Sequence, residues 1–112
     1  MKGVLPRLGF FPIQFCALPV EMLSALPLLA EFLGTFLLVL AVLASGTNPW
    51  IVGGALALII LLVGSMSGAH VNPAVSVAMF LKGALSTQEL AAYMGVQVLG
   101  GAASLYAYNA FA

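Results

Sequence analysis

Residues 67–76 read SGAHVNPAVS, a polar interruption between two apolar runs of the chain. This decapeptide holds the only histidine, His70, and shortly after it Asn72 and Pro73. An asparagine followed by a proline predicts the start of a helix, because the Asn side chain caps orphan backbone amides and proline lacks an N–H that would need a partner. We therefore expect an irregular loop over residues 67–72 and a short half-helix over residues 73–82.

The composition is that of a membrane protein. Of the 112 residues, 63% are hydrophobic and only 5% are charged, and the mean hydropathy is +1.20, whereas soluble domains carry about 25% charged residues. The net charge is zero and there is no basic cluster, so nucleic acid is not an expected partner. The one cysteine, Cys16, can form no disulfide within the chain, and we expect it to act as a small apolar side chain.

Three apolar stretches are long enough to cross a bilayer: residues 23–44, 50–66 and 87–111, where each crossing needs about 20 residues. Ser86 and Glu89 have the spacing of a capping box, which would start the third crossing. The predicted fold class is an all-α membrane protein, with three transmembrane helices and one re-entrant half-helix forming a single domain over residues 22–112. Small residues on the crossings should let helices approach closely; they are Gly53, Gly54, Gly95, Gly100 and Gly101.

Residues 1–21 are apolar but contain Pro6, Pro12 and Pro19. Each interior proline removes a backbone hydrogen bond that lipid cannot replace, so we interpret this segment as a leader that does not span the membrane. A secretory signal peptide is an alternative, because basic residues precede an apolar run. A translation start at Met22 is another.

The half-helix would begin at membrane depth. Irregular backbone survives there only where protein buries it or where it lines a water-filled cavity, because lipid cannot satisfy its carbonyl groups. A helix that starts at such a cavity places about half a positive charge at its tip, an arrangement used by channels and transporters. The pattern therefore indicates a re-entrant pore segment.

The same residues resemble a known family. SGAHVNPAVS at 67–76 is similar to the first asparagine-proline-alanine loop of the aquaporins and aquaglyceroporins, the major intrinsic proteins. AEFLGTF at 30–36 resembles the first helix of that family, and Tyr93, Gln97, Gly100 and Gly101 match its third helix. The resemblance implies a pore made of two inverted repeats, each with three crossings and one half-helix. These 112 residues hold the pattern of one repeat, which is why we interpret the chain as a half-aquaporin.

The resemblance also implies roles at the start of the half-helix. In Asn72, Pro73 and Ala74, the asparagine amide would donate a hydrogen bond to a water or hydroxyl oxygen, while the helix tip repels protons and cations. The alternative is a purely structural role, in which Asn72 only caps the half-helix. Val52, twenty residues before Asn72, occupies a position where the family usually has an aromatic residue that narrows the outer filter. The resemblance therefore implies a wider and less polar filter, and we do not expect selectivity for water alone.

Further roles concern the loop and its support. Gly68, Ala69 and His70 would offer backbone carbonyls along the pore. The carboxylate of Glu31 would brace the loop together with His70, since an intramembrane acid should face the bundle interior; a proton relay between these two is the alternative. Tyr93 and the other aromatic residues at helical spacing are interpreted as lipid or packing contacts.

The sequence gives no reason to expect an enzyme, a cofactor or a metal site. The three basic residues, Lys2, Arg7 and Lys82, would fall on one face of the predicted topology. By the positive-inside rule that face is cytoplasmic, which predicts an integral protein of the cell or inner membrane with a cytoplasmic N-terminus.

The function predicted is that of a passive channel subunit for water or small neutral, glycerol-like solutes. Its partners would be the lipid bilayer, and either a second copy in a homo-oligomer or a complementing second-half chain that closes the pore. Two alternatives stay open: a non-conducting assembly or regulatory role, and a truncated fragment of a full-length channel.

Overall fold

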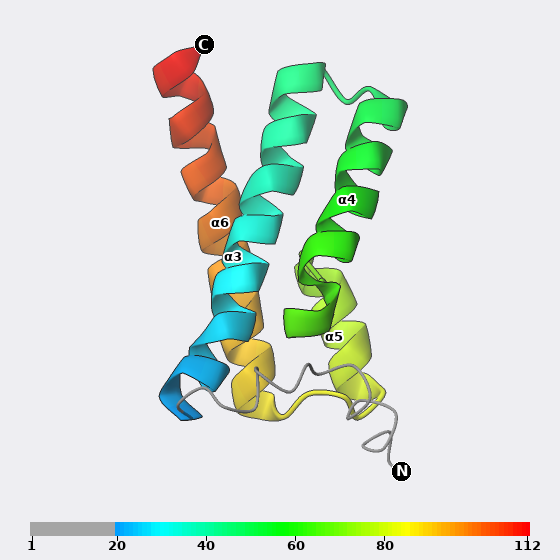
Figure 1. Cartoon of the computed structure of the whole chain (residues 1–112), viewed down its shortest axis with the longest axis vertical. Coiled ribbons are helices and arrows are strands. Elements are labelled where there is room, and N and C mark those ends of the chain that lie inside the picture. Colours follow the sequence, from blue (N-terminus) through cyan, green and yellow to red (C-terminus); the bar gives the residue numbers. More distant parts are fainter. Residues whose placement is uncertain (1–19) are drawn as a thin grey trace.

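The computed structural model describes residues 20–112, with side chains from residue 25, and this part of the chain folds into four helices (Figure 1). They are α3 (Val20–Ser45), α4 (Pro49–Ser67), α5 (Pro73–Leu81) and α6 (Thr87–Phe111). The expected leader lies outside the described residues apart from its last two, which belong to the first turn of α3.

Three of these helices are long and apolar enough to cross a membrane, over Ala25–Ser45, Pro49–Ser67 and Thr87–Phe111. The fourth, α5, has 9 residues. At 1.5 Å per residue it is about 14 Å long, roughly half the thickness of a hydrocarbon core. The prediction of an all-α membrane protein is confirmed, and the described residues contain no strand.

The long helices form a small bundle around α3. Helix α3 packs against both α4 and α6, and α5 packs against α6. Helices α3 and α6 run side by side in the same direction, whereas α4 returns antiparallel to α3 after a short turn (Figure 1). Helix α5 leads back to the end of the bundle where α6 begins, and the loop before α5 connects it to the end of α4.

A close helix crossing joins α3 to α6 at Gly100. A Cβ atom built on Gly100 would stand 2.5 Å from the carbonyl oxygen of Phe32 and 3.3 Å from the amide nitrogen of Phe36. Only glycine leaves room for this backbone-to-backbone contact, as membrane helix interfaces often require. The prediction about small residues is correct here, but a Cβ on Gly53, Gly54 or Gly95 would meet nothing within 4 Å among the described residues.

The helix starts follow the capping signals of the sequence. The Ser86 hydroxyl accepts from the amide of Glu89 at 3.1 Å, and the Glu89 carboxylate accepts from the amide of Ser86 at 2.9 Å. The predicted capping box at α6 is therefore confirmed. Asn48 caps α4 in the same way, since its side-chain oxygen accepts from the amides of Trp50 and Ile51.

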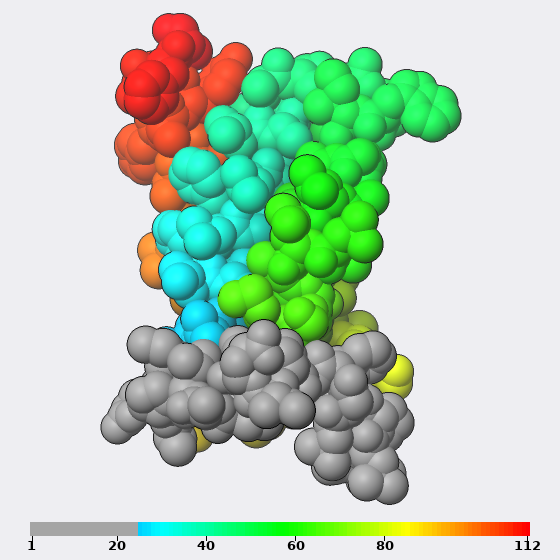
Figure 2. Space-filling view, viewed as in Figure 1, coloured from blue at the N-terminus to red at the C-terminus, as the bar shows by residue number. Residues whose placement is uncertain are grey.

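Many large apolar side chains are exposed, as a lipid-facing surface requires, and Figure 2 shows the face of the molecule that α3 and α4 form. Leu61 on α4, Leu81 on α5 and Val98 on α6 are all exposed. Exposed aromatic residues, Trp50 and Phe111, lie at the end of the bundle formed by the α3–α4 turn and the C-terminus of α6. Trp and Tyr are enriched at membrane–water interfaces, so this end fits an interfacial position.

Candidate functional site

The loop between α4 and α5 carries the candidate site. Gly68 caps the C-terminal end of α4 in the left-handed conformation (φ +90°). The Asn72 side-chain oxygen accepts from the amide of Ala74 at 2.8 Å and caps the start of α5. Pro73 occupies the start of α5, where its missing N–H costs nothing. The residues of SGAHVNPAVS thus end one helix and begin another by ordinary capping chemistry.

Two non-glycine residues of this loop hold an unfavourable backbone. Ala69 has φ +50° and Val71 has φ +44°. A positive φ is a genuine outlier for a β-branched residue such as valine. Such conformations cost on the order of 1–3 kcal/mol each and persist only where the surrounding structure imposes them. Something must therefore hold this loop in place.

Glu31 of α3 supplies most of that support. Its carboxylate is fully buried and accepts four hydrogen bonds. One oxygen accepts from the Ser67 hydroxyl at 2.7 Å and the His70 amide at 2.8 Å. The other accepts from the Val71 amide at 2.6 Å and the Gln97 side-chain amide at 2.9 Å. These four donors match the four lone-pair sites of a carboxylate, which offsets the cost of burying a charge at this depth.

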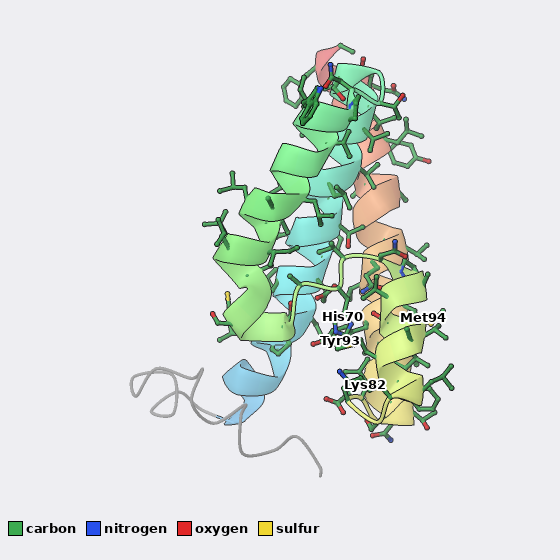
Figure 3. The ribbon with its side chains drawn as sticks, turned by 90° about the vertical axis from the view of Figure 1, so that its right-hand side faces the viewer. His70, Lys82, Tyr93 and Met94 are labelled. Carbon is green, nitrogen blue, oxygen red and sulfur yellow. The ribbon has the colours of Figure 1, made fainter. Side chains whose placement is uncertain are left out.

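Ser67 and Tyr93 tie the end of α4 to α6. The Tyr93 hydroxyl donates to the Ser67 carbonyl at 2.8 Å, and the Ser67 side-chain oxygen accepts from the Ala69 amide at 3.0 Å. Tyr93 is only 6% exposed, and its ring centroid lies 5.1 Å from that of His70 (Figure 3). The interpretation of Tyr93 as a lipid or packing contact was incomplete, because its hydroxyl also fixes the last carbonyl of α4.

The His70 side chain joins a second set of polar contacts. Its Nδ1 lies 2.9 Å from the hydroxyl oxygen of Ser76 on α5, and the Gln97 amide nitrogen donates to the same hydroxyl at 2.8 Å. Ser76 and Gln97 are at most 1% exposed. Through Gln97 this set connects to Glu31, so α3, α5, α6 and the loop share one buried polar network.

The other expected site residues lie at the rim of this network. Asn72, Gly68 and Ala74 are exposed, and Pro73 is partly exposed. Ala69 is 7% exposed and its side chain faces the protein. Val52 lies apart from all of them in the first turn of α4, about 22 Å along the helix from its last residue, Ser67.

Sequence reasoning assigned no hydrogen-bonding role to four members of the network, which are Ser67, Ser76, Tyr93 and Gln97. All four are polar or partly polar residues inside apolar helices, and that placement is the signal that could have found them. Tyr93 and Gln97 are also four residues apart, which puts them on one face of α6. Among the described residues, no three His, Cys, Asp or Glu side chains come together in a metal-ligand cluster.

Comparison with known proteins identifies the family. The sequence profile of the major intrinsic proteins matches residues 20–110, which include the loop and all four helices except the last residue of α6. The chain belongs to the major intrinsic protein family. That membership places it among relatives that are channels rather than enzymes.

Individual major intrinsic proteins are similar over most of the described residues. The chain is 39% identical over 89 residues to aquaglyceroporin AqpS of Rhizobium meliloti, a match covering 66% of this chain and 38% of that protein. It is 38% identical over 95 residues to human aquaporin-9, covering 70% and 32%. It is 40% identical over 88 residues to a probable glycerol uptake facilitator of Thermotoga maritima, covering 64% and 38%.

The match spans only part of those relatives. The chain covers between 32% and 38% of the length of these three major intrinsic proteins. No solved structure matches the chain significantly.

Proposed function

We propose that this chain is one repeat of a passive membrane channel for water or small neutral solutes. The single observation that carries the proposal is the buried network around Glu31, which holds the loop so that Asn72 is exposed at the start of α5. The family membership and the names of the relatives, which include aquaporins and a glycerol uptake facilitator, support the same class of solute.

Asn72 would recognise the solute through its amide group. Its side-chain oxygen already accepts from Ala74, and this contact turns the NH₂ group away from α5. An NH₂ group is a donor only, so it suits the oxygen of water or of an alcohol. The start of α5 adds about half a positive charge from the helix dipole, which disfavours cations at this point.

The loop backbone would supply the complementary acceptors. The carbonyl groups of Gly68, Ala69 and His70 precede Asn72, and the amides of His70 and Val71 are bound to Glu31. With these amides bonded to the protein interior, the carbonyls are the groups left to accept from a passing solute. Val52 would contribute a small apolar side chain at a separate level, which favours solutes wider than water.

A closed pore requires more wall than these helices provide. We propose that a second copy or a complementing half covers the exposed loop and the faces of α4 and α5 beside it. Lys82 lies at the end of the bundle where α5 meets the turn to α6 (Figure 3). By the positive-inside rule this end would be cytoplasmic, and the N-terminal basic residues are proposed to lie on the same side.

A second candidate is a fragment of a longer channel, or a half-protein that assembles with channels without conducting. The observation in its favour is the limited coverage of the relatives, at most 38% of their length for the three named here. Copurification of an intact channel with this chain, together with the absence of flux from the chain alone, would support this candidate over a self-completing pore.

The test is solute flux into proteoliposomes that contain the purified chain, measured by light scattering after osmotic shock. Asn72→Asp should reduce flux strongly, because it replaces the donor NH₂ by an acceptor and adds a negative charge. Asn48→Asp is the matched control: Asn48 also caps a helix through its side-chain oxygen, and aspartate caps equally well. Where the unmodified chain conducts, equal flux in both variants would contradict the proposed role of Asn72.

A further inference from the structure

The hydroxyl of Ser76 stands between a side-chain amide and an imidazole. It lies 2.8 Å from the Gln97 nitrogen and 2.9 Å from Nδ1 of His70, and Ser76 is fully buried. A hydroxyl has one hydrogen to donate, and an imidazole nitrogen either donates or accepts. The direction of these two bonds therefore determines which nitrogen of His70 carries its proton.

The orientation of Gln97 is fixed by Glu31. The Glu31 carboxylate accepts four hydrogen bonds, so the Gln97 group facing it must be the NH₂ rather than the oxygen. The second hydrogen of that NH₂ group is donated to Ser76. The other end of the Gln97 amide, Oε1, is buried without a partner, so no bond to Oε1 competes for this orientation.

Ser76 must then donate to His70. Its oxygen accepts from Gln97, and within the described part of the chain the only other polar group it contacts is Nδ1 of His70. If Nδ1 also donated to Ser76, the hydroxyl hydrogen would be buried without an acceptor, which costs about 1–3 kcal/mol. The favourable arrangement is a directed chain of hydrogen bonds from Gln97 to Ser76 to His70.

We infer that Gln97 and Ser76 are positioning residues that hold His70 as a neutral imidazole with its proton on Nε2. Nε2 lies on the Gly68 side of the ring, since a Cβ atom built on Gly68 would be 3.2 Å from it. The imidazole thus directs an N–H toward the loop, while its basic lone pair is occupied by Ser76.

The functional importance of this tautomer rests on the proposed function, whereas the measurement of the tautomer does not depend on it. A histidine beside a water path could pass protons if its lone pair were free to accept one. Here a proton can reach Nδ1 only by displacing the hydrogen bond from Ser76, which is itself fully buried. The network would therefore keep the only histidine from acting as a proton relay in a channel for neutral solutes.

The test uses ¹⁵N-labelled histidine in the full chain, reconstituted in lipid nanodiscs. Because the sequence has one histidine, the spectrum contains a single pair of ring nitrogens. Bare and protonated ring nitrogens have well-separated ¹⁵N shifts, so the tautomer is read directly. We expect Nδ1 to be the bare, hydrogen-bonded nitrogen and Nε2 to be protonated at neutral pH.

Substitutions at Gln97 and Ser76 test the direction of these hydrogen bonds. In Gln97→Glu the new carboxyl group and Glu31 would share one proton, because two carboxylates this close cannot both be ionised. With that proton held between them, the other oxygen of the new carboxyl group is an acceptor opposite Ser76, so Ser76 should donate to it and the His70 proton should move to Nδ1. Ser76→Ala should remove the hydrogen-bond shift at Nδ1, and Ser76→Thr, which keeps the hydroxyl, should restore it. Ser104→Ala is the matched control, because Ser104 is also a fully buried serine but has no bond to this network.

A protonated Nδ1 in the unmodified chain would overturn the inference, as would a tautomer that stays unchanged in folded Gln97→Glu. Circular dichroism establishes that each variant retains its helices. The spectrum is independent of solute flux, so a chain that fails to conduct but shows the expected tautomer would count against the proposed function alone.

Discussion

Gly34 of α3 lies against Val71 of the loop, and the space for the valine side chain exists only because residue 34 has none. A Cβ atom built on Gly34 would stand 2.5 Å from Cγ1 of Val71 and 3.2 Å from Cγ2 of Ile59. Val71 is the residue with the least favourable backbone in the loop, at φ +44°. The valine is therefore fixed on two sides, by the bond from its amide to Glu31 and by its contact with Gly34.

We predict that Gly34→Ala loosens the loop and that Val71→Ala in the same chain largely reverses the effect. The added methyl group conflicts chiefly with the stiff side chain of Val71, and truncating that side chain removes the closer of its two tight contacts. The measurement is hydrogen exchange at the amides of His70 and Val71, which should become faster in the single variant and return most of the way in the double variant. Gly53→Ala, whose Cβ would meet nothing within 4 Å, should leave exchange unchanged.

Gly100→Ala should destabilise the bundle in a way that no side-chain truncation relieves. Its Cβ would meet the backbone of Phe32 rather than a side chain, so α3 and α6 would have to separate. We expect a loss of about 1–3 kcal/mol, typical of overpacking. Gly101→Ala is the neighbouring control, because its nearest contact is an ordinary 3.6 Å to Val39 and alanine favours a helix. Thermal unfolding in detergent should separate the two, and equal midpoints would contradict the assigned contact.

Gly34 and Gly100 show which features of the fold could be predicted from the sequence and which could not. Asn72 followed by Pro73, and Ser86 with Glu89, predict helix starts because capping depends on residues within one turn. The burial of Glu31 follows as well, since a charge within an apolar helix must face protein. The separate effects of Gly34 and Gly100 could not be predicted, because they depend on which atoms of another helix lie opposite.

The same limit applies to α6. The sequence places Tyr93 and Gln97 on one helix face, but local spacing does not say what that face meets. Their partners, Ser67 and Glu31, are 26 and 66 residues distant along the chain. Only the packing of α6 against α3 and α5 brings these groups together, so their roles required the structure.

Tyr93→Phe should lower the stability of the fold by about 0.5–1.5 kcal/mol, the usual net value of one hydrogen bond. The substitution keeps the ring beside His70 and removes only the hydroxyl that donates to Ser67. Tyr106→Phe serves as the control, because Tyr106 is 75% exposed on the same helix. Denaturation midpoints in matched micelles would measure the difference. An identical loss in both variants would assign the effect to the membrane interface rather than to the bond with Ser67.

Glu31→Gln should be the most damaging single-atom change in the site. A glutamine offers one acceptor oxygen and one NH₂ group, so the NH₂ would face donors that the carboxylate now satisfies, such as the amides of His70 or Val71. Leaving buried donors unpaired costs about 1–3 kcal/mol for each group, and the unfavourable φ values of the loop would lose their support. Glu89→Gln is the matched control, because Glu89 is exposed and glutamine also completes a capping box. We expect Glu31→Gln to speed hydrogen exchange at His70 and Val71 and to lower the unfolding midpoint, while Glu89→Gln changes neither. Unchanged exchange at those two amides in the Glu31 variant would show that the loop conformation does not depend on the carboxylate.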